Sequence, residues 1–168
     1  MEVEIRFKDT GNVKDTLVSL GAVCKGTFEE HDVYYTFEKD TQRLFIMRFR
    51  QKHGKTILTF KGSSKSTQDI AWQEWEQDIT DAHALQQLLI SNGFNILVEI
   101  KKTRTQFTCQ GMQINIDTIQ HLGNFVEIES IGEDVDAQHK KILDFAQQLG
   151  IAKKDIITKG YVKLMLGE

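Results

Sequence analysis

Strand-like segments of this chain carry charged side chains on one face and apolar side chains on the other. In residues 2–8, for example, Glu2, Glu4 and Arg6 alternate with apolar residues, and a period of two is typical of a β-strand. The signs of the charges are also sorted by segment. The basic faces hold Arg48, Arg50, Lys61, Lys102 and Arg104, and the acidic faces hold Glu2, Glu4, Glu127 and Glu129. Solvated strand faces tend to mix lysine and glutamate, so the sorting favours a binding site.

Amphipathic helices indicate which way these faces point. Helical spacing of apolar residues predicts helices within residues 12–21, 80–91 and 135–149, and such helices need an apolar sheet face to cover. If they cover the outside, the charged faces point inward. About eight strands can close into a barrel with a small interior. We therefore predict an α+β fold, an antiparallel eight-stranded β-barrel with a charged interior and helices packed outside.

Gly21 and Gly93 end two of these helices at matching places in the chain. Glu2-x-Glu4 precedes the first helix and Glu74-x-Glu76 precedes the second, which indicates a duplicated strand–helix–strands unit. A length of 168 residues suits one domain, 1–168. Strands are expected at 2–8, 31–37, 43–50, 56–61, 71–79, 97–108, 112–119 and 124–130, with a polar loop at 62–68 and a helical tail at 156–166.

The composition narrows the choice of partner and compartment. A net charge of -3 argues against a nucleic-acid or membrane-surface binder. No apolar run approaches the roughly 20 residues that span a bilayer. Two cysteines, Cys24 and Cys109, are too few for a disulfide scaffold, and the first strand begins at Glu2, so we expect a reduced, cytoplasmic protein without a signal peptide. The sequence is silent on oligomeric state, and a homodimer is compatible with it.

A barrel interior crowded with ionised groups needs compensation. Two carboxylates about 4 Å apart repel by roughly 4 kcal/mol at an effective dielectric near 20. Clustered carboxylates thus favour a cation, and clustered arginine and lysine favour an anion. Mg²⁺ and Mn²⁺ bind carboxylate oxygens together with substrate phosphates, while arginine binds phosphate through two parallel hydrogen bonds. The charged faces therefore predict a metal-bound polyphosphate.

Short motifs follow one another along nearly the whole chain. They are residues 2–6 (EVEIR), 31–35 (HDVYY), 47–50 (MRFR), 58–62 (LTFKG), 74–76 (EWE), 101–104 (KKTR), 122–129 (LGNFVEIE) and 159–161 (KGY). In this order they resemble the CYTH superfamily, also called triphosphate tunnel metalloenzymes, and are most similar to its class IV adenylate cyclase branch. The resemblance implies an antiparallel tunnel and a metal-dependent reaction on a triphosphate: ATP, inorganic triphosphate or thiamine triphosphate.

The resemblance also implies roles for individual residues. Mg²⁺ or Mn²⁺ would be held by Glu2, Glu4, Glu127, Glu129 and Asp117, with Glu74 and Glu76 adding contacts to the metal or to water. The phosphates would be bound by Arg48, Arg50, Lys61, Lys102, Arg104 and Lys159. The family motif usually has lysine where Arg6 stands, and arginine stays protonated, so it cannot activate water as a base. Lys8, Tyr34, Tyr35, His31 or a metal-bound hydroxide would then serve; we place Arg6, Lys8 and Tyr34 in the catalytic set.

The expected function is a class IV adenylate cyclase-like reaction, ATP to cyclic AMP and pyrophosphate. An inorganic or thiamine triphosphatase is the alternative, because a tunnel that recognises the triphosphate distinguishes these substrates poorly. A second alternative is a non-catalytic binder of nucleotide or polyphosphate. A carrier of apolar ligands is disfavoured, since it would need an apolar interior.

Overall fold

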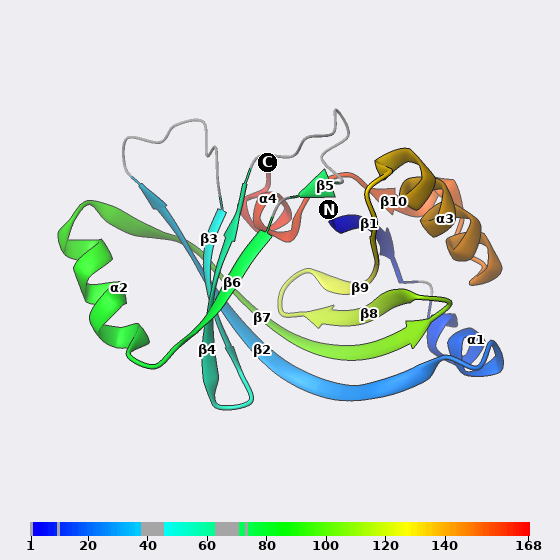
Figure 1. Ribbon diagram of the computed structural model, residues 1–168, viewed down its shortest axis with the longest axis horizontal. Coiled ribbons are helices and arrows are strands. Elements are labelled where there is room, and N and C mark those ends of the chain that lie inside the picture. The colour runs from blue at the N-terminus through cyan, green and yellow to red at the C-terminus, as the bar shows by residue number, and fades with distance from the viewer. Residues whose placement is uncertain (1, 10, 38–45, 63–70, 73) are drawn as a thin grey trace.

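The computed structural model describes residues 2–9, 11–37, 46–62, 71–72 and 74–168. They form a ten-stranded antiparallel sheet, strongly curled, with four α-helices (Figure 1). The elements in chain order are β1 Glu2–Lys8, α1 Val13–Ser19, β2 Val23–Phe37, β3 Ile46–Lys52, β4 Lys55–Lys61, β5 Ala71–Trp72, β6 Glu74–Ile79, α2 Ala82–Ser91, β7 Phe94–Cys109, β8 Met112–Ile119, β9 Gly123–Ile131, α3 Val135–Gln148, a 3₁₀ turn Lys153–Asp155, β10 Ile156–Ile157 and α4 Tyr161–Leu166.

The sheet order is β10-β1-β9-β8-β7-β2-β3-β4-β6, and β5 also pairs with β1. Leaving out the two-residue strands β5 and β10, eight strands remain, in agreement with the expected number. The expected closure is only partial. The segment predicted as one strand, 71–79, divides between the two edges of the sheet, with β5 on β1 and β6 on β4. In the described residues the sheet is therefore a curled, tunnel-like sheet and not a fully hydrogen-bonded barrel.

The duplicated unit is visible in the topology. The first half runs β1-α1-β2-β3-β4 and the second runs β6-α2-β7-β8-β9. Each strand of the first half has a counterpart in the second half. If every strand is replaced by its counterpart, the sheet order from β1 to β6 becomes the same order in reverse. The long strands β2 and β7 pair with each other at the centre of the strand order. They run from the α2 side to the α1 side of the molecule (Figure 1).

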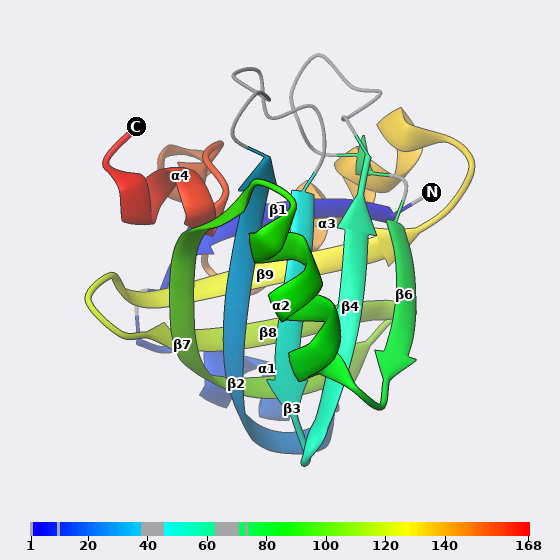
Figure 2. The ribbon, with the colours of Figure 1, turned by 90° about the vertical axis from the view of Figure 1, so that its left-hand side faces the viewer.

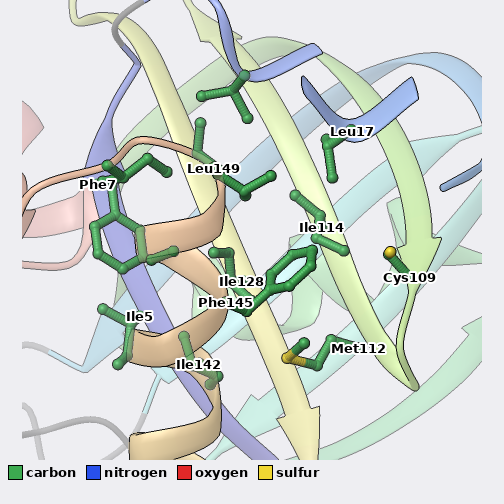
Figure 3. Packing of buried hydrophobic residues seen from close by; sticks show 14 of the residues in the cluster. Ile5, Phe7, Leu17, Cys109, Met112, Ile114, Ile128, Ile142, Phe145 and Leu149 are labelled. Carbon is green, nitrogen blue, oxygen red and sulfur yellow. The ribbon is translucent and has the colours of Figure 1, made fainter. Parts of the chain in front are cut away.

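Helices α1 and α3 cover the outer, apolar face of β1, β9 and β8. Phe145 and Ile142 of α3 pack against Ile5 and Ile128, and all four are at most 3% exposed (Figure 3). Full burial of such side chains contributes roughly 1.5–3 kcal/mol each. Burial of the outer face directs the alternate, charged side chains of the same strands inward.

Helix α2 covers the outer face of the other half, in front of β2, β3 and β4 (Figure 2). Its N-terminus is capped by Asp81, whose carboxylate accepts a hydrogen bond from the Ala84 amide at 3.1 Å. A carboxylate also interacts favourably with the positive end of the helix dipole.

Helix α4 is the exception to helices packed outside. Its Tyr161 packs with Tyr34, Ile100 and Phe125, which share the inner face with the charged residues. The predicted helical tail, 156–166, is in fact a two-residue strand followed by this short helix. The expected strand 31–37 extends back to Val23 because it continues to pair with β7.

Two other expectations fall on segments that the structure covers only in part. Residues 63–68 of the expected polar loop and 43–45 of an expected strand lie outside the described residues. Among the helices described, none has the length and apolar character needed to cross a bilayer.

Candidate functional site

Charged side chains on the inner face form one connected network. Ion pairs of 4.0 Å or less lead from Arg48 through Glu74, Lys61, Glu4, Arg6, Glu127, Arg104 and Glu30 to Arg50. These residues come from β1, β2, β3, β4, β6, β7 and β9, so the curl of the sheet brings them together. The expected basic and acidic strand faces therefore meet in one interior.

Arg104 of β7 lies at the centre of this network. Its guanidinium donates to both oxygens of Asp117 at 2.7 and 2.5 Å, since the two residues are direct partners across β7 and β8. It also donates to Glu127. These carboxylates outweigh the effect of burial and hold the pKa of Arg104 well above its usual value. Arg104 thus presents a fixed positive charge in a dry setting.

Glu30 and Asp32 of β2 gather a second group of cations. Arg50 donates to both oxygens of Asp32 at 2.7 and 2.8 Å. Glu30 lies 2.7 Å from Lys52, 3.3 Å from Arg50 and 3.4 Å from Lys102. Burial alone would raise the pKa of Glu30, but the cations lower it to about 2. Both carboxylates are therefore ionised and keep their cations converged.

Strands β3 and β4 of the first half carry a third group of cations, Arg48 and Lys61. Arg48 donates to Thr59 at 2.9 Å and to Glu76 at 3.0 Å, because the three residues form one row across β3, β4 and β6. Lys61 lies 2.9 Å from Glu74 and 3.5 Å from Glu2. Arg48 and Lys61 thus connect the β6 edge of the sheet with β1.

Arg6 uses every nitrogen of its guanidinium. Nε donates to Glu127 at 2.8 Å, Nη2 to Glu4 at 3.0 Å and also to Glu127, and Nη1 to the Lys159 carbonyl at 3.2 Å. Its carbon lies 4.2 Å from the centre of the Tyr161 ring. Burial opposes the charge, but Glu127 and Glu4 raise the pKa of Arg6 well above its usual value. Arg6 is therefore a permanent cation that ties β1, β9 and the C-terminal segment together.

Glu129 differs from its neighbour Glu127. Burial outweighs Arg104, and Glu127, Glu2 and Glu4 add repulsion, so the pKa of Glu129 rises to about 8. Glu4 lies directly opposite Glu129 across β1 and β9, where like charges destabilise a sheet. In Glu127 the burial effect is overcome by Arg6 and Arg104, and its pKa falls far below its usual value.

Glu129 offers carboxylate oxygens, the ligand type that a hard divalent cation prefers. Its own oxygens accept amide hydrogen bonds from Gln113 at 2.7 Å and Asn115 at 2.8 Å. Across the described residues no three acidic, histidine or cysteine side chains converge as ready-made ligands. Glu4, which lies opposite Glu129, is paired with Arg6 and Lys61. A cation at Glu129 would relieve the repulsion that raises its pKa.

Lys102 is the interior cation with the least compensation. Its ammonium lies 3.4 Å from Glu30 and 3.7 Å from Asp32, and both carboxylates already bind closer cations. Burial, together with Arg104 and Arg50, lowers the pKa of Lys102 to about 8. Lys102 is therefore an interior amine that holds its proton more weakly than an ordinary lysine.

Some expected site residues lie at the rim or outside it. Lys8 is exposed, with its ammonium 4.7 Å from the Phe125 ring centre. Lys159 is exposed and donates to the Glu168 carbonyl, so only its backbone joins the network. His31 faces outward and lies 2.9 Å from Glu99. Tyr34 faces inward opposite Arg48, and burial, with Asp32, raises its pKa.

Sequence reasoning missed Glu30, Asp32, Lys52 and Tyr161. The first two share the parity of Tyr34 on β2, so the alternation contained a signal that their strand also has a charged inner face. Lys52 extends the parity of Arg48 and Arg50 by one step. Tyr161 stands in the KGY motif, but no strand alternation indicated an inward position, because α4 reaches the interior through tertiary packing.

The model of the CYTH domain matches residues 1–161. The chain belongs to the CYTH domain family. A Methanocaldococcus jannaschii protein named provisionally as an adenylate cyclase is 26% identical over 98% of this chain and 97% of its own length.

Solved structures share the fold of this chain. A conserved hypothetical protein from Pyrococcus furiosus has a TM-score of 0.88 at 28% identity, covering 98% of this chain and 99% of its own. A Hippeastrum protein named provisionally as an adenylyl cyclase and described as having a dominant triphosphatase activity has a TM-score of 0.69, covering 99% of this chain and 95% of its own. Its 14% identity indicates a shared fold alone.

The inner face of this CYTH sheet carries groups of the kind that attract a polyanion and groups of the kind that attract a cation. Its arginines and lysines are held in place by carboxylates of the same inner face. A phosphate chain that bound these cations would release carboxylates, and a divalent cation would neutralise them. This exchange is the chemistry that the network makes available.

Proposed function

We propose that the protein is a divalent-metal-dependent enzyme that acts on a triphosphate, with a class IV adenylate cyclase-like reaction from ATP to cyclic AMP and pyrophosphate. The observation that carries the proposal is the continuous interior network from Arg48 to Arg50, in which cations suited to phosphate alternate with carboxylates suited to a metal. A solvated surface has no need of such alternation. The M. jannaschii relative's name supports the choice of reaction.

The phosphates would be bound by the basic strands. Arg48, Arg50, Lys61, Lys102 and Arg104 are cations of the inner face, and positive charge held in place before reaction stabilises charge that develops on phosphate oxygens. Lys159 is left with a backbone role, since its ammonium lies outside. Bound Mg²⁺ or Mn²⁺ would supply Lewis-acid polarisation of the phosphates. Glu129, Glu2 and Glu4 would hold it, while Asp117, Glu127, Glu74 and Glu76 keep the cations oriented.

The attacking oxygen must lose a proton. Arg6 stays protonated and is no base, and the raised pKa of Tyr34 disfavours its phenolate. Lys8 is exposed at the rim. Lys102, with a pKa of about 8, is the inner-face amine that can exchange a proton near neutral pH.

A triphosphatase is the second candidate. Inner-face side chains named above recognise charge, and water can replace the ribose hydroxyl as the attacking oxygen. The dominant triphosphatase activity described for the Hippeastrum protein supports this candidate through the shared fold.

One assay separates these activities. The protein is incubated with ATP, inorganic triphosphate or thiamine triphosphate, with Mg²⁺ or Mn²⁺, and products are resolved by chromatography. Cyclic AMP with pyrophosphate supports the cyclase, and orthophosphate supports the triphosphatase. Tight binding without turnover would identify a non-catalytic binder and overturn the enzymatic proposal. Lys101→Met changes a residue on the outer face, next to Lys102 in the sequence, and should retain activity. It is the control for substitutions of Lys102.

A further inference from the structure

Tyr161 of the C-terminal segment touches several inner-face charges. Its hydroxyl donates to Asp117 at 3.1 Å, and its ring lies 4.2 Å from the Arg6 guanidinium carbon and 5.6 Å from the Lys102 ammonium. Tyr161 is only 6% exposed. The position thus combines an aromatic face for Arg6 with a hydrogen bond to the carboxylate that orients Arg104.

The ring contact suits an arginine. A planar guanidinium can stack on an aromatic ring while its edge donates hydrogen bonds, whereas a lysine ammonium has no flat face. Arg6 uses both properties at once, because its edge binds Glu127, Glu4 and the Lys159 carbonyl while its face meets Tyr161. A lysine at position 6 could not make all of these contacts.

The Lys159 carbonyl and the Tyr161 ring belong to the same short segment. Phe125 supports the ring from the other side, with ring centres 5.3 Å apart at 66°. The phenol is a poor proton donor to solvent here, because burial, with Glu127 and Asp117, holds its pKa well above the usual value. Tyr161 is therefore fixed both by packing and by charge.

We propose that Tyr161 is a positioning residue that holds the Arg6 guanidinium, and through it Glu127 and Glu4, in the geometry of the site. Arg6 and Tyr161 act as a unit. The Tyr161 ring allows an arginine to function at a position where the family motif usually has lysine. The functional half of this inference rests on the proposed reaction, while the contact itself does not.

The test is a double-mutant cycle on the full chain. Tyr161→Leu removes the ring and keeps an apolar side chain, Tyr161→Phe removes only the hydroxyl, and Arg6→Lys removes the planar face. Tyr161→Leu should lower kcat for the triphosphate substrate about 5- to 30-fold, the range of a buried cation–π contact, with a smaller change in KM. In the Arg6→Lys protein the same substitution should have less than about a third of that effect.

A spectroscopic readout separates positioning from general stability. In ¹H–¹⁵N spectra, the Arg6 Nε–H signal should show a ring-current shift and slow exchange in the wild type and in Tyr161→Phe. Both should be lost in Tyr161→Leu. Equal kcat losses from Tyr161→Leu with and without Arg6→Lys, or an unchanged Arg6 signal in Tyr161→Leu, would overturn the proposal.

The same experiment distinguishes the two levels of inference. If wild-type protein turns over no triphosphate, the proposed reaction fails, and the Arg6 signal still decides whether Tyr161 holds the guanidinium. If turnover is present but shows no coupling between the two positions, the positioning role fails while the proposed reaction stands.

Discussion

Two glutamates on one strand illustrate how neighbouring residues acquire opposite properties. Glu127 and Glu129 both face inward on β9, but Arg6 and Arg104 bind Glu127, whereas Glu129 receives amide hydrogen bonds and faces Glu4. Burial raises the pKa of both carboxyls, and only in Glu127 do cations reverse the effect. The first is a structural anion, and the second is suited to gain a cation.

Neutralising each glutamate should therefore give different results. Glu127→Gln leaves Arg6 and Arg104 short of a buried partner and should cost about 3–5 kcal/mol of unfolding free energy, with loss of turnover. Glu129→Gln should cost less than about 1 kcal/mol in metal-free protein, because its carboxyl is already disfavoured as an anion. It should also abolish stabilisation by Mn²⁺. Denaturant unfolding with and without Mn²⁺ measures both; equal costs would contradict this assignment.

The lowered pKa of Lys102 predicts that the free energy of unfolding depends on pH. Burial, with Arg104 and Arg50, lowers its folded pKa to about 8, below the usual value of 10.5 for a lysine. The folded state thus binds its proton more weakly than the unfolded state, so this group destabilises the fold below about pH 8. Its penalty fades as the pH rises towards 10.5.

Lys102→Met should then raise the unfolding free energy at pH 7 by about 1 kcal/mol or more, and by less at pH 10. Affinity for inorganic triphosphate should fall, since a phosphate-facing cation is lost. Denaturant melts at the two pH values and calorimetric titration provide the measurements. The exposed Lys101→Met protein should behave as wild type; a gain at pH 10 equal to that at pH 7 would exclude this explanation.

At the scale of elements, α3 and α2 contribute differently. α3 buries Ile142, Phe145 and Ala146 against β1, β8 and β9, whereas α2 has no fully buried residue. The outer faces of the strands are thus covered unequally. The stability of the sheet should therefore depend mainly on α3. The positions of the inner-face charges are set by the strands that carry them.

Phe145→Ala should cost about 3–5 kcal/mol of unfolding free energy, because it leaves a cavity behind β1 and β9. Leu88→Ala on α2, at a side chain 60% exposed, should stay within about 0.5 kcal/mol of wild type. Chemical denaturation compares the two proteins. A smaller loss for Phe145→Ala than for Leu88→Ala would mean that α3 is not the principal cover of the sheet.

At the scale of the whole molecule, the interior is neutralised by its own residues. Each cation that would bind phosphate already contacts a carboxylate of another strand, as Arg50 contacts Asp32 and Arg104 contacts Asp117. A polyanion alone must compete with these carboxylates, and a metal alone must compete with these cations. Binding of the two together avoids both penalties.

Thermal unfolding should accordingly respond to the pair and not to either component. The Mg²⁺–triphosphate complex, taken as one ligand at about 100 times its dissociation constant, should stabilise the protein by about 2.7 kcal/mol. Triphosphate with EDTA, or Mg²⁺ alone, should give less than half of that shift. Full stabilisation by triphosphate in EDTA would show that the carboxylates do not bind a cation together with the phosphates.

The sequence by itself determined the strands, the helices on the outer face and the inward direction of the sorted charges, because periodicities of two and 3.6 are local properties of the chain. It also predicted that Arg48, Arg50, Lys61, Lys102 and Arg104 share one interior. It placed the ammonium of Lys159 there too, and the structure puts that group outside.

Only the tertiary structure decided which charges pair. Glu30 collects Arg50, Lys52 and Lys102 because register and curl set distances between strands that are far apart in sequence. The same holds for α4, which enters the inner face through Tyr161, and for the segment 71–79, which divides between two sheet edges. Alternation along a strand determines the face on which a side chain lies. Contacts across the interior depend on how the whole sheet curls, and no local sequence pattern specifies that curl.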